Sequence, residues 1–302
     1  MRWIPGGEFV MGSDHHYAEE APARTVAVDG FWMDRHPVTN RQFARFVEET
    51  GYTTEAEIAP DPAMYPGAPA ENLVPGSMVF VGTNGPVDLR DVRQWWRWVP
   101  GANWRHPWGP GSSLRKLDDH PVVHVSWADV EAYASWAGKQ VPTEAEWERA
   151  ARGGLDGAEF TWGTRDTTDE RLLANIWVGA FPYRNAKPVA IRRTSPVGRF
   201  APNGFDLVDM AGNVWEWTAD WWERERFAAE SGCPCCVPSN PRGASETASR
   251  DHGTGIPQKV VKGGSHLCHR QACFRYRPAA RQPQMVDTGM SHVGFRLIAR
   301  PA

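Results

Sequence analysis

The chain has 302 residues, a formal net charge of -3, and unusually many Trp (16), Gly (29) and Pro (25) residues. Its basic residues form no long run, and no apolar stretch approaches the length of a membrane span, which argues against nucleic-acid and membrane partners. The first residues lack the apolar region of a signal peptide, so we expect a soluble, cytoplasmic protein. Five Cys residues in a chain of this length do not make a disulfide scaffold.

The predicted elements are short, as the many Gly and Pro residues indicate. Residues 3–11 and 24–33 mix apolar and small residues and predict two strand regions, the first with a turn. Thr39 is the predicted N-cap of a helix that ends at Gly51. Apolar residues recur along this helix at i, i+3 and i+4, which gives it a buried stripe of Phe43, Phe46 and Val47.

Residues 59–111 are rich in Pro, Gly and Trp and show no helical period. We expect a long excursion without regular structure, held in place by Trp packing; loops of this length are often functional. A second helix is predicted to begin at Ser126 and to end at Gly138. Its buried face is expected to carry Val130, Tyr133 and Ala134.

Thr143 and Glu146 form a capping box at the start of a third predicted helix, which ends at residues 153–154. Residues 294–298 alternate in polarity and predict a final strand. No linker, repeat or shift in composition marks a second domain. The four Trp residues between positions 215 and 222 could line a peptide groove, but we expect most of them to be core.

Two cysteines, Cys268 and Cys273, lie in one cation-rich segment directly after a Gly-Gly turn. A regular helix or strand would keep their side chains apart, so the sulfurs can meet only if the backbone loops between them. Two thiolates suit a soft metal such as Cu(I), a zinc site with further ligands, or a redox disulfide. The spacing fits two buried, inert cysteines or a local stabilising bridge equally well. The candidate cations that would lower a thiol pKa here are His269, Arg270, Arg275 and Arg277.

Motifs along nearly the whole chain resemble those of the formylglycine-generating enzyme (sulfatase-modifying factor) family, in its bacterial type. The matching segments are residues 4–13, 37–43, 101–107, 120–127, 142–148, 212–217, 263–277 and 294–296. Several of these occur throughout the superfamily. The specific part is Trp104-Arg105-His106-Pro107 together with the two-cysteine segment, because many relatives with the same fold lack the cysteine pair.

The resemblance implies one domain over residues 1–302, with an α+β fold of the C-type-lectin-like kind and little regular secondary structure. It implies an oxidase that uses dioxygen to convert the cysteine of a Cys-x-Pro-x-Arg motif to Cα-formylglycine. The substrate would be an unfolded or nascent sulfatase polypeptide, and an external thiol or another reductant would be consumed. Dioxygen reacts slowly with a closed-shell thiol, so a soft redox metal that opens a one-electron route agrees with this chemistry.

By the same likeness Cys268 and Cys273 hold Cu(I), and the substrate thiolate becomes a third sulfur ligand. Ser265, Trp104 and His292 are implied to shape the pocket for oxygen and substrate. His292 stands where some family members have Asn. An acidic partner for the substrate arginine is expected on general grounds, but the sequence does not name it.

The resemblance also implies structural calcium, an ion that prefers hard oxygen ligands in a tight loop. One family site matches in the carboxylates and carbonyls of Asp209, Gly212, Val214 and Glu216. A second family site begins at Asn175, and its later Asp falls at Val189 in this chain. We expect this second site to be weak or empty.

Other features have plainer interpretations beside functional ones. His124 is expected to be a hydrogen-bonded packing histidine. His106 fits a packing role and a role as a ligand or base equally well. Cys233, Cys235 and Cys236 are expected in an exposed loop, although residues 236–240 match the substrate motif except for Asn in place of Arg. Two rival functions stay open at this point. One is a non-catalytic peptide- or protein-binding module of the same fold, and the other is a sulfoxide-forming iron oxygenase, which would need His and carboxylate ligands.

Overall fold

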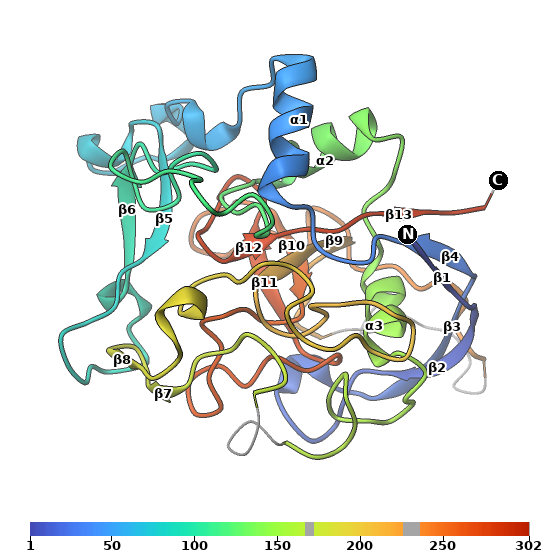
Figure 1. Cartoon of the computed structure of the whole chain (residues 1–302). Coiled ribbons are helices and arrows are strands. Elements are labelled where there is room, and N and C mark those ends of the chain that lie inside the picture. Colours follow the sequence, from blue (N-terminus) through green and yellow to red (C-terminus); the bar gives the residue numbers. More distant parts are fainter. Residues whose placement is uncertain (167–171, 226–235, 302) are drawn as a thin grey trace.

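The computed structural model describes residues 1–166, 172–225 and 236–301, and these form short helices and strands joined by long loops (Figure 1). The α-helices are α1 (Asn40–Thr50), α2 (Trp127–Trp136) and α3 (Glu144–Arg152). The 3-10 helices are η1 (Ala18–Glu20), η2 (Glu55–Glu57), η3 (Pro62–Met64), η4 (Ala70–Asn72), η5 (Val92–Gln94) and η6 (Val189–Ile191). This confirms the predicted α+β fold with little regular secondary structure.

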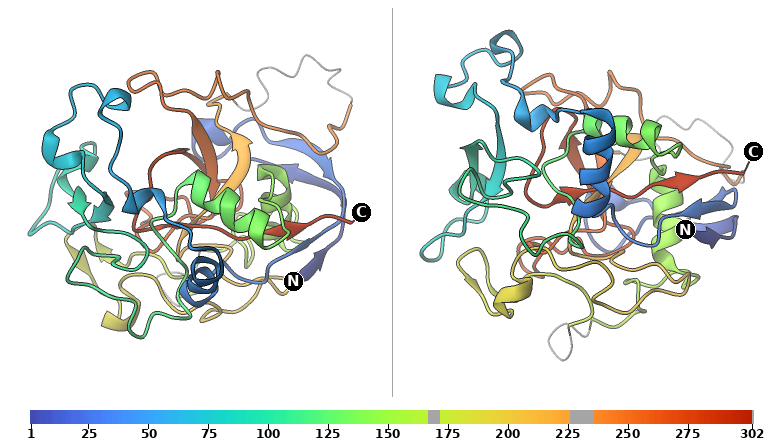
Figure 2. Two further views of the ribbon diagram at one scale, coloured as in Figure 1. Left: turned by 90° about the horizontal axis from the view of Figure 1, so that it is seen from above. Right: turned by 45° about the horizontal axis from the view of Figure 1, so that its top comes forward.

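The strands form several small sheets. Their bounds are β1 (Arg2–Ile4), β2 (Gly7–Met11), β3 (Arg24–Val28), β4 (Phe31–Met33), β5 (Gly76–Phe80), β6 (Trp96–Pro100), β7 (Gly179–Ala180), β8 (Arg184–Asn185), β9 (Trp215–Trp221), β10 (Gln258–Lys262), β11 (Arg281–Met285), β12 (Val293–Gly294) and β13 (Ile298–Ala299). The largest sheet has the order β11-β10-β9-β12, and β12 joins β9 in parallel. The sheet β1-β4-β13 pairs strands from both ends of the chain, so the termini lie close together in all three views (Figures 1 and 2).

The three α-helices begin where local capping signals place them. Thr39, Ser126 and Thr143 each accept a hydrogen bond from the third helical N–H, and the side chain at that third position bonds back to the cap. Gly51 and Gly153 then follow α1 and α3 in the left-handed conformation, with φ of 70° and 58°. The predicted helices and their buried stripes are therefore confirmed.

Two predictions about strands are wrong. Residues 59–111 contain the antiparallel pair of β5 and β6, and the alternation of Trp96, Arg97 and Trp98 was a strand signal that the expectation of an irregular excursion overlooked. The single strand expected over residues 294–298 is instead split between β12 and β13, which belong to different sheets. Arg296 lies between them, fully buried and bound to Glu216, so the alternation of polarity does not reflect alternating exposure.

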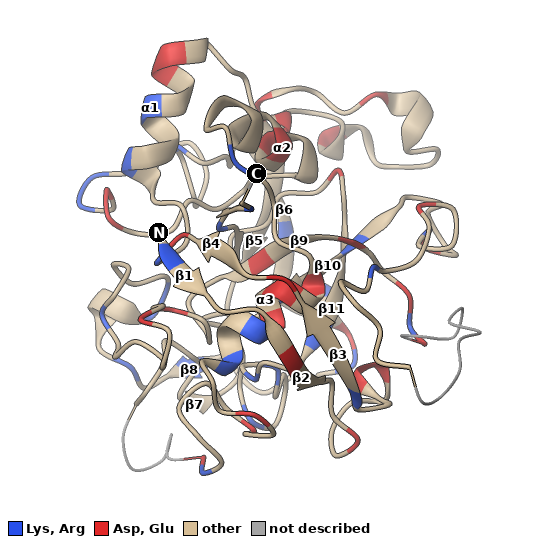
Figure 3. Ribbon diagram, turned by 90° about the vertical axis from the view of Figure 1, so that its right-hand side faces the viewer, with Lys and Arg blue, Asp and Glu red and all other residues tan. Residues whose placement is uncertain are grey.

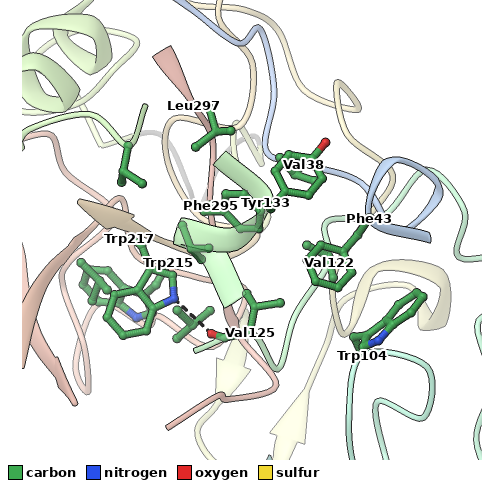
Figure 4. Close-up of a cluster of buried hydrophobic side chains, with 14 of the residues drawn as sticks. Val38, Phe43, Trp104, Val122, Val125, Tyr133, Trp215, Trp217, Phe295 and Leu297 are labelled. Carbon is green, nitrogen blue, oxygen red and sulfur yellow. Dashed lines mark hydrogen bonds between the residues drawn. The ribbon is translucent and has the colours of Figure 1, made fainter. Parts of the chain in front are cut away.

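The main hydrophobic cluster joins α1 and α2 to the central sheet (Figure 4). Phe43 of α1 stacks on Tyr133 of α2 with ring centroids 5.8 Å apart. Trp215 and Trp217 are fully buried there, and the Trp217 indole donates to the Val125 carbonyl at 3.1 Å, so these two are core as expected. Cys268 belongs to the same cluster, which places the thiol pair at the edge of the core.

Acidic and basic residues are interspersed over the elements seen in Figure 3, and α3 carries both. This agrees with the absence of a long basic run in the sequence. Among the helices that the structure describes, none is both long and apolar enough to cross a membrane.

Candidate active site at the thiol pair

The chain loops sharply between Cys268 and Cys273. The Cys268 N–H donates to the Ser265 carbonyl and the Cys273 N–H to the His269 carbonyl, at 2.9 and 2.7 Å. As a result the two sulfur atoms lie 2.9 Å apart, so the expected convergence is confirmed. Gly264 makes the entry into this loop possible, because its φ is 71° and a Cβ there would lie 2.9 Å from the Arg275 carbonyl oxygen.

The two thiols have different surroundings. Cys268 is only 1% exposed, whereas Cys273 is partly exposed. Burial raises the pKa of Cys268 well above its usual value, and the pKa of Cys273 is lowered chiefly because it accepts the hydrogen bond from Cys268. The Ser265 N–H also points to the Cys268 sulfur, at 3.4 Å. The pair therefore consists of a buried thiol with a raised pKa beside a partly exposed thiol with a lowered one.

The segment that follows Cys273 is fastened to the N-terminal part of the chain. The Arg275 guanidinium forms an ion pair with Glu19 at 2.6 Å and lies 3.7 Å from the centre of the Tyr17 ring. Arg277 makes a two-pronged ion pair with Glu20 at 2.6 and 2.8 Å. The sequence analysis did not single out Tyr17, Glu19 or Glu20. The only signal in the sequence was that two adjacent acidic residues could pair with two arginines two positions apart.

The candidate cations are not equivalent in the structure. Arg275 contributes to lowering the pKa of Cys273 through its charge, after the hydrogen bond from Cys268. Arg277 is instead fully buried against Glu20. Arg270 lies 3.7 Å from Asp166 and is largely exposed. Arg275 therefore acts on the thiol pair as expected.

The other side of the thiol loop is held by residues 175–177 and by Asn213. The Trp177 N–H donates to the Cys268 carbonyl at 2.9 Å. The His266 backbone N–H donates to the Asn213 carbonyl oxygen at 3.0 Å, and the ring Nδ1 of His266 lies 2.9 Å from the same oxygen. The Asn213 N–H in turn donates to the Asn175 carbonyl at 2.8 Å. Trp177, Asn175 and Asn213 were not singled out for this role from the sequence, where nothing local indicates it.

The three polar groups predicted for the pocket are all buried. The Ser265 hydroxyl accepts the Leu267 N–H at 3.2 Å, within the thiol loop itself. The Trp104 ring meets the edge of Phe43, and its indole Nε1 has no hydrogen-bond partner within the described part of the chain. Trp104 shares the main hydrophobic cluster with Cys268, so it packs near the site through apolar contacts.

His292 packs against Trp96 of β6, with ring centroids 4.6 Å apart and the ring planes tilted by 46°. Burial lowers its pKa to about 3, and within the described residues its Nδ1 has no hydrogen-bond partner. The Trp215 N–H donates to its carbonyl at 2.8 Å. His292 is thus a neutral imidazole with an unused nitrogen, buried between the pair of β5 and β6 and the central sheet.

His124 and His106 both make packing contacts. His124 is fully buried between the Ser77 hydroxyl and the Pro107 carbonyl, at 2.8 and 2.9 Å, and burial lowers its pKa to about 4. This confirms the expected packing histidine. The His106 Nδ1 lies 2.6 Å from the Ser112 carbonyl, which favours packing there too.

The predicted calcium loop is tight and carries two buried carboxylates. Asp209 and Gly212 have φ of 56° and 72°. The Asp209 carboxylate accepts the Gly198 N–H, and burial raises its pKa. Glu216 accepts hydrogen bonds from Arg296 at 2.6 and 2.7 Å and from Trp147 at 2.8 Å, so one of its carboxylate oxygens, Oε1, accepts only a single bond. Asp209 fits a calcium ligand well, and Glu216 fits through Oε1.

No group of three or more His, Cys, Asp and Glu side chains suited to a metal is found in residues 1–166, 172–225 and 236–301. A three-residue His and carboxylate iron site is therefore not found among them. Cys236 is exposed, in keeping with the expected loop, while Cys233 and Cys235 lie outside the described residues.

Known proteins resemble this chain in sequence and in fold. The model of the sulfatase-modifying factor enzyme 1-like domain matches residues 1–301. The chain is 52% identical to the formylglycine-generating enzyme of Mycobacterium tuberculosis, over 99% of this chain and 97% of that protein. It is 45% identical to the one of Thermomonospora curvata, over 99% and 92%. The structure of PvdO from Pseudomonas aeruginosa is similar in fold alone, with a TM-score of 0.62 at 24% identity over 99% of this chain and 93% of that one. The chain belongs to the sulfatase-modifying factor enzyme 1-like family.

Proposed function

We propose that this protein oxidises the cysteine of a Cys-x-Pro-x-Arg segment in a sulfatase polypeptide to Cα-formylglycine. The observation that carries this proposal is the convergent pair of Cys268 and Cys273, in a chain similar over its whole length to formylglycine-generating enzymes. In the balanced reaction the substrate CH₂–SH group becomes an aldehyde and releases hydrogen sulfide. Each turnover consumes one dioxygen together with two electrons and two protons from an external thiol or another reductant, and it forms one water beside the aldehyde and the hydrogen sulfide.

The donor set fits a soft monovalent ion, because two sulfurs converge and no His or carboxylate of the described residues joins them to form a metal-binding group. Cu(I) held by Cys268 and Cys273 would supply a one-electron route to dioxygen. Both thiols must lose their protons to bind a metal, and the hydrogen bond from Cys268 lowers the pKa of Cys273 and so favours this loss. Arg275 offsets part of the resulting negative charge. The partial exposure of Cys273 leaves the pair open on one side, where a substrate sulfur would approach.

The residues around the pair hold it in place for the reaction. Ser265 and Trp177 fix the Cys268 backbone and sulfur through hydrogen bonds. Trp104 and His292 carry buried ring nitrogens that have no hydrogen-bond partner in the described part of the protein. We assign to these two the shaping of the oxygen and substrate pocket, since an unused buried donor or acceptor is available to a bound peptide.

We further propose that Asp209, Glu216 and the carbonyls of Gly212 and Val214 hold one structural Ca²⁺. The support is the buried Asp209 carboxylate, which forms no ion pair with a described cationic side chain, in a loop with left-handed turns. A hard divalent cation would compensate this buried charge.

The test is peptide oxidation followed by mass spectrometry. Copper-loaded protein, dioxygen, a reductant and a Cys-x-Pro-x-Arg peptide should yield the aldehyde, whereas the peptide with Ser in place of Cys should be unchanged. Cys268→Ser and Cys273→Ser should each abolish the product, and Cys236→Ser, a matched change at an exposed thiol, should not. Full activity in either thiol variant contradicts the proposal. Peptide binding without any aldehyde would favour the binding module instead.

A further inference from the structure

Lys187 is a buried cation for which the proposed reaction has no use. It is 2% exposed, and its Nζ donates to the Asn175 side-chain oxygen at 2.5 Å. Among the residues that the structure describes, no carboxylate forms an ion pair with it. Burial lowers its pKa to about 7. Because an ammonium group without a carboxylate is costly to bury, its position needs a structural reason.

The reason lies in Asn175, whose side-chain oxygen is fixed towards Lys187. The Asn175 amide group donates to the Arg193 carbonyl at 2.8 Å, and this fixes the orientation of the side chain. The Asn175 backbone carbonyl accepts from Asn213, and Asn175 also bridges to Gly212 of the calcium loop. Asn175 therefore presents a buried amide oxygen, which is a ligand type that hard cations prefer.

The residues here do not fit a metal ion. In the second calcium site that the family resemblance implies, an Asp further along the chain would be a ligand, and Val189 stands at its position. Val189 is 77% exposed and begins η6, and its side chain offers no oxygen to a metal ion. Two residues earlier, the Lys187 amino group donates a hydrogen bond to the Asn175 side-chain oxygen, where a metal ion would bind.

We propose that the ε-amino group of Lys187 takes the place of a metal ion beside Asn175, so that this position binds no Ca²⁺. The internal cation fixes Asn175, and residues 175–177 in turn fix the thiol loop through the bond from Trp177 to the Cys268 carbonyl. The support for the thiol loop on this side is thereby independent of the calcium concentration. The inference does not depend on the proposed oxidation reaction.

Calcium counting tests this directly. Protein freed of metal by a chelator is dialysed against Ca²⁺, and bound calcium per chain is measured for the wild type and for Asp209→Leu, which removes both side-chain oxygens at the other calcium position. We expect at most one Ca²⁺ in the wild type and none in Asp209→Leu. Two Ca²⁺ in the wild type, or any stoichiometric Ca²⁺ in Asp209→Leu, overturns the proposal.

A charge reversal gives a second readout in the Asp209→Leu background. Lys187→Glu places a buried carboxylate next to the Asn175 oxygen, and this charge needs a cation. Its melting temperature should rise by about 5 °C at a hundredfold excess of Ca²⁺ over its dissociation constant. Lys187→Met, the uncharged control, should melt at a temperature that Ca²⁺ does not change. A folded Lys187→Glu protein with no response to Ca²⁺ contradicts the proposal. If Lys187→Glu does not fold, the calcium counts still decide.

Discussion

The ion pair of Glu20 with Arg277 should be among the most stabilising contacts near the thiol loop. The side chains are 0% and 1% exposed, and two bonds of 2.6 and 2.8 Å join them. The Arg277 Nε donates to the Phe274 carbonyl, next to Cys273. Glu20→Gln leaves a buried arginine without its counter-charge, and breaking one half of a buried pair costs about 3–5 kcal/mol. We expect a loss of this size in the free energy of unfolding.

Urea unfolding at neutral pH measures this loss, with Asp119→Asn as the matched control. Asp119 forms an ion pair with Arg41 at 3.0 Å, but the side chains are 66% and 64% exposed, so this variant should show no measurable change. The double variant Glu20→Gln/Arg277→Met removes both charges and should recover much of the lost stability. If Glu20→Gln loses no more stability than Asp119→Asn, the reasoning about this buried pair is wrong.

Three further predictions concern the site and its surroundings. Alkylation near neutral pH, followed by peptide mapping, should modify Cys273 before Cys268, because Cys273 is partly exposed and its pKa is lowered, whereas burial raises that of Cys268; equal rates would contradict this order. Stability should fall as the pH drops from about 6.5 towards 4. In this window His124 becomes protonated in the unfolded chain, whereas in the folded protein burial lowers its pKa to about 4 and keeps the ring neutral. His124 accounts for about 3 kcal/mol of this loss in the free energy of unfolding. Stability measured by urea unfolding should therefore depend less on pH in His124→Gln than in the wild type, and an equal dependence in both would refute the assignment. Gly289→Ala would bring a Cβ within 2.7 Å of the His124 backbone and should cost about 1–3 kcal/mol in urea unfolding, while Gly85→Ala, where a Cβ meets nothing, should cost far less.

Features encoded by neighbouring residues were predictable from the sequence. The capping boxes at Thr39, Ser126 and Thr143 and the glycines after α1 and α3 use contacts within a few residues, so their patterns predict the helices directly. For Cys268 and Cys273 the spacing gave only a condition, since two sulfurs five residues apart meet only in an irregular segment, and it was the family resemblance that favoured their convergence. The fold class followed from the resemblance of the short motifs.

Contacts between distant parts of the chain were not predictable. Glu19 and Glu20 meet Arg275 and Arg277 across 256 or 257 positions, and no local pattern specifies which acid binds which arginine. The final strand was predicted wrongly for a related reason. Arg296 has the polarity of an exposed residue, and distant partners satisfy it in the interior, chief among them Glu216, 80 positions away.

The central claim is that Cys268 and Cys273 together hold one soft metal ion. It is tested most directly by measuring Cu(I) bound per chain under anaerobic conditions, in competition with a Cu(I) chelator. The starting protein should carry Ser in place of Cys233, Cys235 and Cys236, so that only the convergent pair can bind. We predict one Cu(I) per chain in this protein and none after a further Cys268→Ser or Cys273→Ser change. Undiminished Cu(I) binding in either of these variants would contradict the account.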